Sequence, residues 1–269
     1  MKLCERCHKE REDSDFAQIA SIGVFCSWCR EYIQIIIDQQ GEDAARTWVY
    51  SPRHDMLDLI EGEGKHVLDC GCWAGYTLEE LEKRGHIPEG LDIWDNRTVA
   101  KHVPFHYCDL ETQPEYWAVK NEMPPSLYNK KFDYILFGDV IEHLVDHTFA
   151  FHLAKEVLNE GGKVIISVPN MGWIGAVLPI ANQHFYRDES GHFDKTHLRF
   201  YTRDVLGKTL VEAGFNHVKM YSKQLPDATP WPEGATGEQQ FQWDNLIVTC
   251  NRDLFEQLNT YQILAVAWA

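Results

Sequence analysis

Short apolar runs of strand length recur along the chain from residue 66 onward, and segments with a helical pattern separate them. The first five runs are 66–71 (HVLDCG), 89–93 (EGLDI), 104–110 (PFHYCDL), 132–139 (FDYILFGD) and 162–170 (GKVIISVPN). The fourth run is apolar throughout its middle, which is typical of a strand covered on both faces. Strands and helices that alternate in this way predict a parallel sheet with crossover helices.

Two further apolar runs complete the predicted sheet. Residues 217–222 (HVKMYS) and 261–269 (YQILAVAWA) are strand-like, and a stretch rich in proline and glycine lies between them. We therefore predict an α/β, Rossmann-like domain at 41–269, with a seven-stranded, mostly parallel sheet and flanking helices. An insertion at 223–258 is expected before the last strand.

Polar and glycine residues mark the expected helix ends. Asp146 is expected to cap a helix that Gly161 ends, between the fourth and fifth strands. Thr202 is expected to cap a second helix, which runs through Ala213 and stops at Gly214.

Four of the eight cysteines form two CxxC pairs near the N-terminus. Cys4, Cys7, Cys26 and Cys29 offer four thiolates at a spacing suited to tetrahedral Zn²⁺. About forty residues with few large apolar side chains would not fold readily without such a metal. The pairs predict a zinc-binding module at 1–40, similar to a zinc ribbon or a treble clef.

The chain has 41 acidic and 25 basic residues, and its formal net charge is −16. Clustered Lys and Arg bind phosphate backbones, so this balance disfavours a nucleic-acid partner and favours a small-molecule, sugar or protein substrate. The N-terminus lacks a signal-peptide pattern, and no apolar run approaches the ~20 residues of a membrane span. We expect a cytoplasmic protein without a membrane partner. The sequence leaves its oligomeric state open.

A turn with two glycines follows the first predicted strand and precedes a predicted helix. In this turn, DCGCWAG at 69–75, glycines let the backbone approach a ligand and the helix N-terminus presents free N–H groups. Asp92 ends the second strand, where dinucleotide-type sites bind ribose hydroxyls. These features alone also fit NAD-binding proteins.

Three later segments narrow the choice of cofactor. YCDL (107–110) ends the third strand, GDVIEHL (138–144) follows the fourth, and SVPN (167–170) follows the fifth. In this order the segments resemble the class I S-adenosylmethionine-dependent methyltransferases. The resemblance is to the group that includes ubiquinone-biosynthesis O-methyltransferases and methyltransferases of polysaccharide pathways. It implies a Rossmann-like fold and S-adenosyl-L-methionine as the cofactor.

The resemblance also implies contacts to the methionine half of the cofactor. Asp69, Gly71 and Gly75 would form the loop around this half, and Cys72 lies in the same turn as a further contact or a packing residue. The chain departs from the family at Trp73, which stands where the usual loop has glycine. This departure indicates a reshaped pocket rim.

Further positions are implied for the nucleoside half and the sulfonium. Asp92 would bind the ribose, and Asp109 would bind the adenine amino group beside the Leu110 backbone. Gly138 would line the sulfonium end, with Asp139 next to it.

Candidate catalytic residues follow the fourth strand. Methyl transfer from a sulfonium is an in-line displacement, so positioning contributes most, and a base is needed where the acceptor carries a proton. Glu142, His143 and His147 are the candidates there, and His197 joins them from the segment DKTHLRFYT (194–202).

The same residues also fit a divalent cation. Asp139, Glu142 and His143 would share one face of a helix at positions i, i+3 and i+4. This segment resembles the metal site of small-RNA 3′-terminal 2′-O-methyltransferases, which implies Mg²⁺ or Mn²⁺ held by these three residues and His197. Asp139 departs from the glutamate of those enzymes. The alternative, that Glu142 and His143 only hydrogen-bond to a loop that closes the site, stays open.

We expect an enzyme that transfers a methyl group from S-adenosylmethionine to a small-molecule or sugar acceptor, at oxygen or nitrogen. One alternative is a metal-dependent RNA 2′-O-methyltransferase, which chelators would inhibit. The other is a non-catalytic zinc-bearing binding adaptor, which would bind the cofactor and methylate nothing.

Overall fold

The computed structural model describes residues 51–111, 123–188, 191–225 and 228–269, together with the backbone of four short N-terminal strands. These strands are β1 (Lys2–Leu3), β2 (Glu10–Arg11), β3 (Phe16–Ile19) and β4 (Gly23–Cys26), paired as β1–β2 and β3–β4. Of the predicted zinc ligands, Cys4, Cys7 and Cys29 lie outside the described residues, and Cys26 is described as backbone only.

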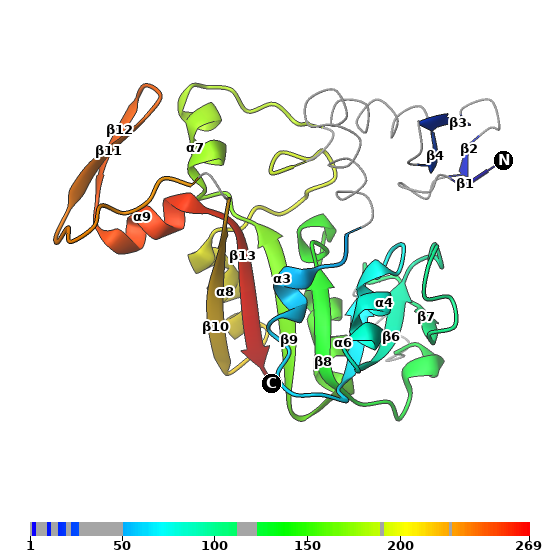
Figure 1. The fold of residues 1–269 in the computed structure, drawn as a ribbon. Coiled ribbons are helices and arrows are strands. Elements are labelled where there is room, and N and C mark those ends of the chain that lie inside the picture. Colours follow the sequence, from blue (N-terminus) through cyan, green and yellow to red (C-terminus); the bar gives the residue numbers. More distant parts are fainter. Residues whose placement is uncertain are drawn as a thin grey trace.

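A seven-stranded sheet forms the centre of the described structure (Figure 1). Its strands, in spatial order, are β10 (His217–Gln224), β13 (Thr260–Trp268), β9 (Leu158–Pro169), β8 (Phe132–Gly138), β5 (His66–Cys70), β6 (Ile87–Asp92) and β7 (Phe105–Tyr107). β13 is antiparallel to β9 and β10, whereas the five strands from β9 to β7 are mutually parallel. The predicted Rossmann-like, mostly parallel sheet is confirmed.

Helices cover both faces of the sheet, and alternate side chains of β8 pack against the helices on opposite faces. Ile135 and Phe137 point into a core shared with α6 (Thr148–Val157) and α8 (Arg203–Glu212). Tyr134 and Leu136 point into a second core, which contains residues of α3 (His54–Leu57) and α4 (Tyr76–Lys83). Burial on both faces explains why this strand has an almost continuous apolar sequence.

Of the predicted helix caps, Thr202 is confirmed, whereas the N-cap of α6 is His147, one residue after the predicted Asp146. Thr202 accepts a hydrogen bond from the Val205 amide at the start of α8, and Asp146 accepts one from the Thr148 amide before α6. The assignment of Gly161 as a helix terminator was wrong. α6 ends at Val157, and Gly161 lies within β9 with φ +74°, where the chain shifts register against β8.

A hairpin and a helix separate β10 from β13. The hairpin, β11 (Gln239–Trp243) and β12 (Leu246–Cys250), is followed by α9 (Arg252–Asn259), and it projects away from the sheet in Figure 1. Aromatic rings join the two elements, since Phe241 lies 4.2 Å from Phe255 between ring centroids.

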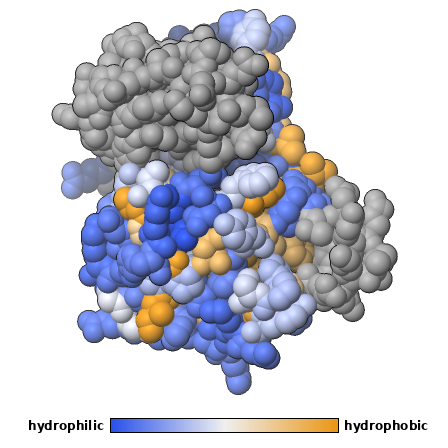
Figure 2. Space-filling model, turned by 90° about the vertical axis from the view of Figure 1, so that its right-hand side faces the viewer, coloured by the Kyte–Doolittle hydropathy of each residue, from blue (hydrophilic) through white to orange (hydrophobic). Residues whose placement is uncertain are grey.

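The described surface is mainly polar on the face drawn in Figure 2, where hydrophobic residues form small separate areas. Among the described helices, none has both the length and the apolar character that crossing a bilayer requires. One further helix, α7 (Ile174–Ala181), and two 3-10 turns, η2 (Pro125–Leu127) and η3 (Ile141–His143), complete the described elements.

Candidate active site

Two cavities lie at the carboxyl ends of the parallel strands, the edge where α/β sheets bind ligands. The larger has a volume of about 350 Å³, and its walls include Asp92 at the end of β6, Asp109 after β7 and His143 in η3. The smaller has a volume of about 190 Å³, and its walls include Asp69 of β5 and Gly138 of β8.

The cavities share Gly71 and Asp139, so they form neighbouring parts of one site. All the positions predicted to contact a cofactor line one cavity or the other. They are Asp69, Gly71, Cys72, Gly75, Asp92, Asp109, Leu110, Gly138 and Asp139. The topology brings these residues together because each lies near the carboxyl end of a parallel strand or in the segment that follows it.

Close packing explains the glycines of the turn after β5. Gly71 has φ +78°, and a Cβ there would lie 2.5 Å from Cγ2 of Val140. Gly75 has φ +89°, and a Cβ would lie 2.7 Å from the carbonyl oxygen of Val99. Both positions therefore exclude a side chain.

Trp73 adopts a left-handed conformation, with φ +41°, at the position where the family has glycine. Its amide donates a 3.0 Å hydrogen bond to Oδ2 of Asp92, and the Ile93 amide donates to Oδ1. The turn thus fixes the carboxylate of Asp92 at the rim of the larger cavity.

The carboxylates near the turn are buried close to one another. Burial, reinforced by the charge of Asp92 and opposed by Arg53, raises the pKa of Asp69 to about 7. Burial also raises the pKa of Asp92, although the amides of Trp73 and Ile93 oppose that shift. Burial raises the pKa of the Cys72 thiol as well, which suits a packing role rather than a reactive one.

Arg53 is a site residue that sequence reasoning missed. Its guanidinium lines the smaller cavity, donates a 2.7 Å hydrogen bond to Asp139, and also contacts Asp55 and Ser167. A lone arginine ahead of a four-residue helix carries no local signal of this role.

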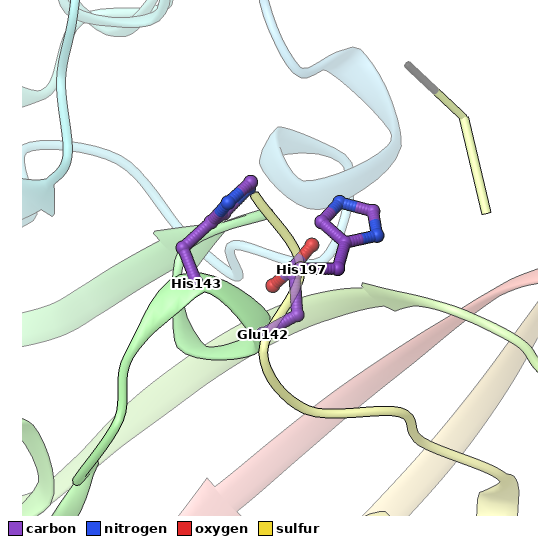
Figure 3. Close-up of side chains that lie close together, drawn as sticks. All are labelled: Glu142, His143 and His197. Atoms are coloured by element: carbon purple, nitrogen blue, oxygen red, sulfur yellow. The ribbon is translucent and has the colours of Figure 1, made fainter. Parts of the chain in front are cut away.

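Glu142, His143 and His197 form a compact cluster beside the larger cavity (Figure 3). One potential ligand atom from each residue lies within 4.8 Å of the others. Glu142 is 1% exposed, and neither of its carboxylate oxygens has a hydrogen-bond partner. Burial, and then the charge of Asp139, raises the pKa of Glu142 well above its usual value. A buried carboxylate without partners is costly, and a cation would satisfy it.

Two predicted members of this group lie elsewhere. Asp139 is not in the cluster, because residues 141–143 form a 3-10 turn rather than an α-helix, so the i, i+3, i+4 argument fails. Its carboxylate accepts hydrogen bonds from Arg53, Ser167 and Gln262 instead. His147 lines neither cavity, and its ring contacts Tyr201 and Phe151.

Glu111 and Arg199 hold the loop after η3 from two sides, and sequence reasoning missed both. The Glu111 carboxylate accepts hydrogen bonds from the amides of Val145 and Asp146. The Arg199 guanidinium donates to the carbonyls of Leu144 and Val145. Because Glu111 lines the larger cavity, these hydrogen bonds connect the cavity wall to the loop that follows Glu142 and His143.

A family of methyltransferase domains matches residues 44–220, more than half of the chain. The chain belongs to this methyltransferase family. The match spans the strands from β5 to β9, and with them both cavities and the cluster.

Several ubiquinone biosynthesis O-methyltransferases resemble the methyltransferase domain. The enzyme of Hydrogenovibrio crunogenus is 27% identical over 145 residues, which cover 53% of this chain and 59% of that protein. That of Psychrobacter arcticus is 23% identical over 174 residues, which cover 65% of this chain and 68% of that protein. The chain thus spans less than two thirds of the first relative's length.

Solved structures share the fold of the methyltransferase domain. A SAM-dependent methyltransferase from Archaeoglobus fulgidus superposes with a TM-score of 0.55 at 18% identity, covering 88% of this chain and 98% of that one. A methyltransferase from Thermotoga maritima gives a TM-score of 0.52 at 15% identity, and the superposition covers 88% of this chain and 99% of that one.

The glycine turn gives a prediction for stability. We expect Gly71→Ala to lower the free energy of unfolding by about 1–3 kcal/mol, because it combines a left-handed conformation with a clash against Val140. Gly85→Ala is the matched control, since Gly85 has φ +80° but nothing within 4 Å of an added Cβ. Urea unfolding of both variants measures the difference. Equal losses would show that the contact with Val140 is unimportant.

Proposed function

We propose that the chain is an S-adenosylmethionine-dependent methyltransferase that methylates a hydroxyl group of a small organic acceptor, with a sugar as an alternative class. The main support is that the two cavities sharing Gly71 and Asp139 have an acidic residue from each of three neighbouring strands. The ubiquinone O-methyltransferase relatives favour oxygen as the methylated atom. The formal net charge of −16 disfavours the RNA alternative.

The residues of the two cavities fit the halves of this cofactor. In the larger cavity, Asp92 would bind the ribose hydroxyls, and Asp109 and Leu110 the adenine. In the smaller, Arg53 would pair with the α-carboxylate and Asp69 with the α-ammonium group. The glycine turn leaves the space that a side chain would fill.

When bound, the cofactor supplies an electrophilic methyl group, and the C–S bond electrons remain on sulfur as an acceptor oxygen bonds to carbon. The protein's part is to orient the acceptor and to take the proton from its hydroxyl. His143 lines the cavity, and burial, together with His197, lowers its pKa, so its imidazole is neutral near pH 7. Without a bound cation, this imidazole would be the group that accepts the proton.

We further propose that Glu142, His143 and His197 hold a divalent cation, Mn²⁺ or Mg²⁺. The orphaned oxygens of Glu142 and the two adjacent imidazoles support this ligand set. Mn²⁺ is the better match, because imidazole nitrogen is a poor ligand for Mg²⁺. A bound cation would lower the pKa of an acceptor hydroxyl and leave the imidazoles as ligands rather than bases.

The N-terminal cysteines support a separate structural proposal. We propose that Cys4, Cys7, Cys26 and Cys29 bind one Zn²⁺ in a module at 1–40, ahead of a catalytic domain at 41–269 with an insertion at 223–258. We expect inductively coupled plasma mass spectrometry to find one zinc ion per chain. The Cys4→Ser, Cys7→Ser double variant should lack this zinc. Purified protein without zinc would refute the module.

The cysteines outside the two CxxC pairs have the free thiols expected in a reducing compartment such as the cytoplasm. Four cysteines of the described part, Cys70, Cys72, Cys108 and Cys250, are free and buried. Proteins of oxidising compartments more often pair such residues in disulfides. We propose a cytoplasmic location on this basis.

The raised pKa of Asp69 gives a test of cofactor binding. Between pH 6 and 7.5 Asp69 ionises, and the ionised form attracts the α-ammonium group, so affinity for S-adenosylhomocysteine should rise with pH by up to about tenfold. Calorimetry across this range measures the slope. Asp69→Asn should flatten it, whereas Glu63→Gln, an exposed site outside both cavities, should not. Absence of binding at every pH would refute the proposed function.

The cation proposal has its own test. Chelator-treated wild-type protein should bind Mn²⁺ in a titration followed by electron paramagnetic resonance and should unfold at a higher temperature with Mn²⁺ present. Glu142→Gln should weaken binding at least tenfold, because it removes the only charged ligand. Glu79→Gln, on the surface of α4, is the control. Equal Mn²⁺ affinity in wild type and Glu142→Gln would contradict this site.

A further inference from the structure

The hydrogen bonds of His143 determine where its ring proton lies. Nδ1 of His143 is 3.2 Å from the carbonyl oxygen of Thr196 and 3.0 Å from its Oγ1. A carbonyl oxygen only accepts hydrogen bonds, so this contact requires the proton on Nδ1. The hydroxyl hydrogen of Thr196 is already used, because Oγ1 donates a 2.6 Å bond to Oδ1 of Asp194. Both Thr196 oxygens therefore act as acceptors toward His143.

The turn that carries Thr196 is held in place independently of His143. Oδ1 of Asp194 also accepts a 2.7 Å bond from the Thr196 amide. From outside the turn, Nη2 of Arg187 donates to the carbonyls of Asp194, Lys195 and His197 at 2.6–3.0 Å. The acceptors for Nδ1 are thus preorganised by side-chain and backbone contacts.

His197, the second imidazole of the cluster, follows the same rule. Its Nδ1 lies 3.3 Å from the carbonyl oxygen of His192, which again requires a proton on Nδ1. In the neutral form of each ring, Nε2 is then the nitrogen with the free lone pair. The two rings lie 4.8 Å apart between centroids, and one nitrogen of each lies within 4.8 Å of a carboxylate oxygen of Glu142 (Figure 3).

We propose that Thr196 and Asp194 are positioning residues that fix His143 in the Nδ1–H tautomer and so reserve its Nε2 as a cation ligand. The proposal rests on the cation site of the proposed function. Outer-shell partners of this kind orient ligating histidines and raise their basicity, and their removal weakens metal binding by roughly 10–100-fold.

The first experiment reads the tautomer directly, without metal or turnover. Two-bond ¹H–¹⁵N correlation spectra of chelator-treated protein distinguish Nδ1–H from Nε2–H, with His143→Gln used to assign the signal. Wild type should show His143 protonated at Nδ1. Thr196→Val removes the nearer acceptor of Nδ1 and the hydroxyl bond to Asp194 that holds the Thr196 carbonyl in place, so it should give a mixture of tautomers. Thr196→Ser, which keeps the hydroxyl, should resemble wild type. A wild-type ring protonated at Nε2 would overturn the proposal.

The second experiment measures Mn²⁺ affinity in the same variants. Thr196→Val and Asp194→Ala should bind Mn²⁺ about 10–100-fold more weakly, and Thr196→Ser should bind it nearly as wild type does. S-adenosylhomocysteine binding and circular dichroism check that each variant is folded. Wild-type tautomer and affinity in folded Thr196→Val would exclude a positioning role. Wild type that shows the Nδ1–H tautomer but binds no Mn²⁺ would refute the cation site and leave the tautomer assignment standing.

Discussion

The ion pair between Arg53 and Asp139 joins the parts of the chain that make the site. Asp139 directly follows β8 with φ +56°, and its carboxylate also accepts hydrogen bonds from Ser167 of β9 and Gln262 of β13. The desolvation cost of burying the Arg53 guanidinium is offset by its ion pairs with the carboxylates of Asp139 and Asp55. Since Asp139 lines both cavities, the shape of the whole site depends on this contact.

The sequence was sufficient for the sheet and for the residues that its topology brings together. Asp69, Asp92 and Asp109 each lie in or just after an apolar run, and parallel strands place such positions on one edge. Arg53 and Arg199 could not be found in this way, because their partners lie 86 and 54–55 residues away and neither has a local pattern. Contacts of this kind are fixed only when the elements pack.

Two predictions failed because a local pattern has more than one structural outcome. Gly161 was assigned to a helix end, yet a glycine with positive φ also serves an irregular strand entry such as that of β9. Asp139 was grouped with Glu142 and His143 by helical spacing, but the segment makes a single 3-10 turn. The cluster forms without Asp139, because a distant loop supplies His197. The amides of Leu198 and Arg199 in this loop donate hydrogen bonds to the backbone carbonyl of Glu142.

The position of β13 has a consequence during protein synthesis. This strand is the last in the described chain, yet it inserts between β9 and β10 and supplies Gln262 to Asp139. A ribosome-bound chain that has emerged only as far as α9 holds two strands with unpaired edges, whose backbone groups are open to wrong partners. The central sheet therefore closes only after β13 has emerged, and until then β9 and β10 are the strands that a chaperone would have to protect.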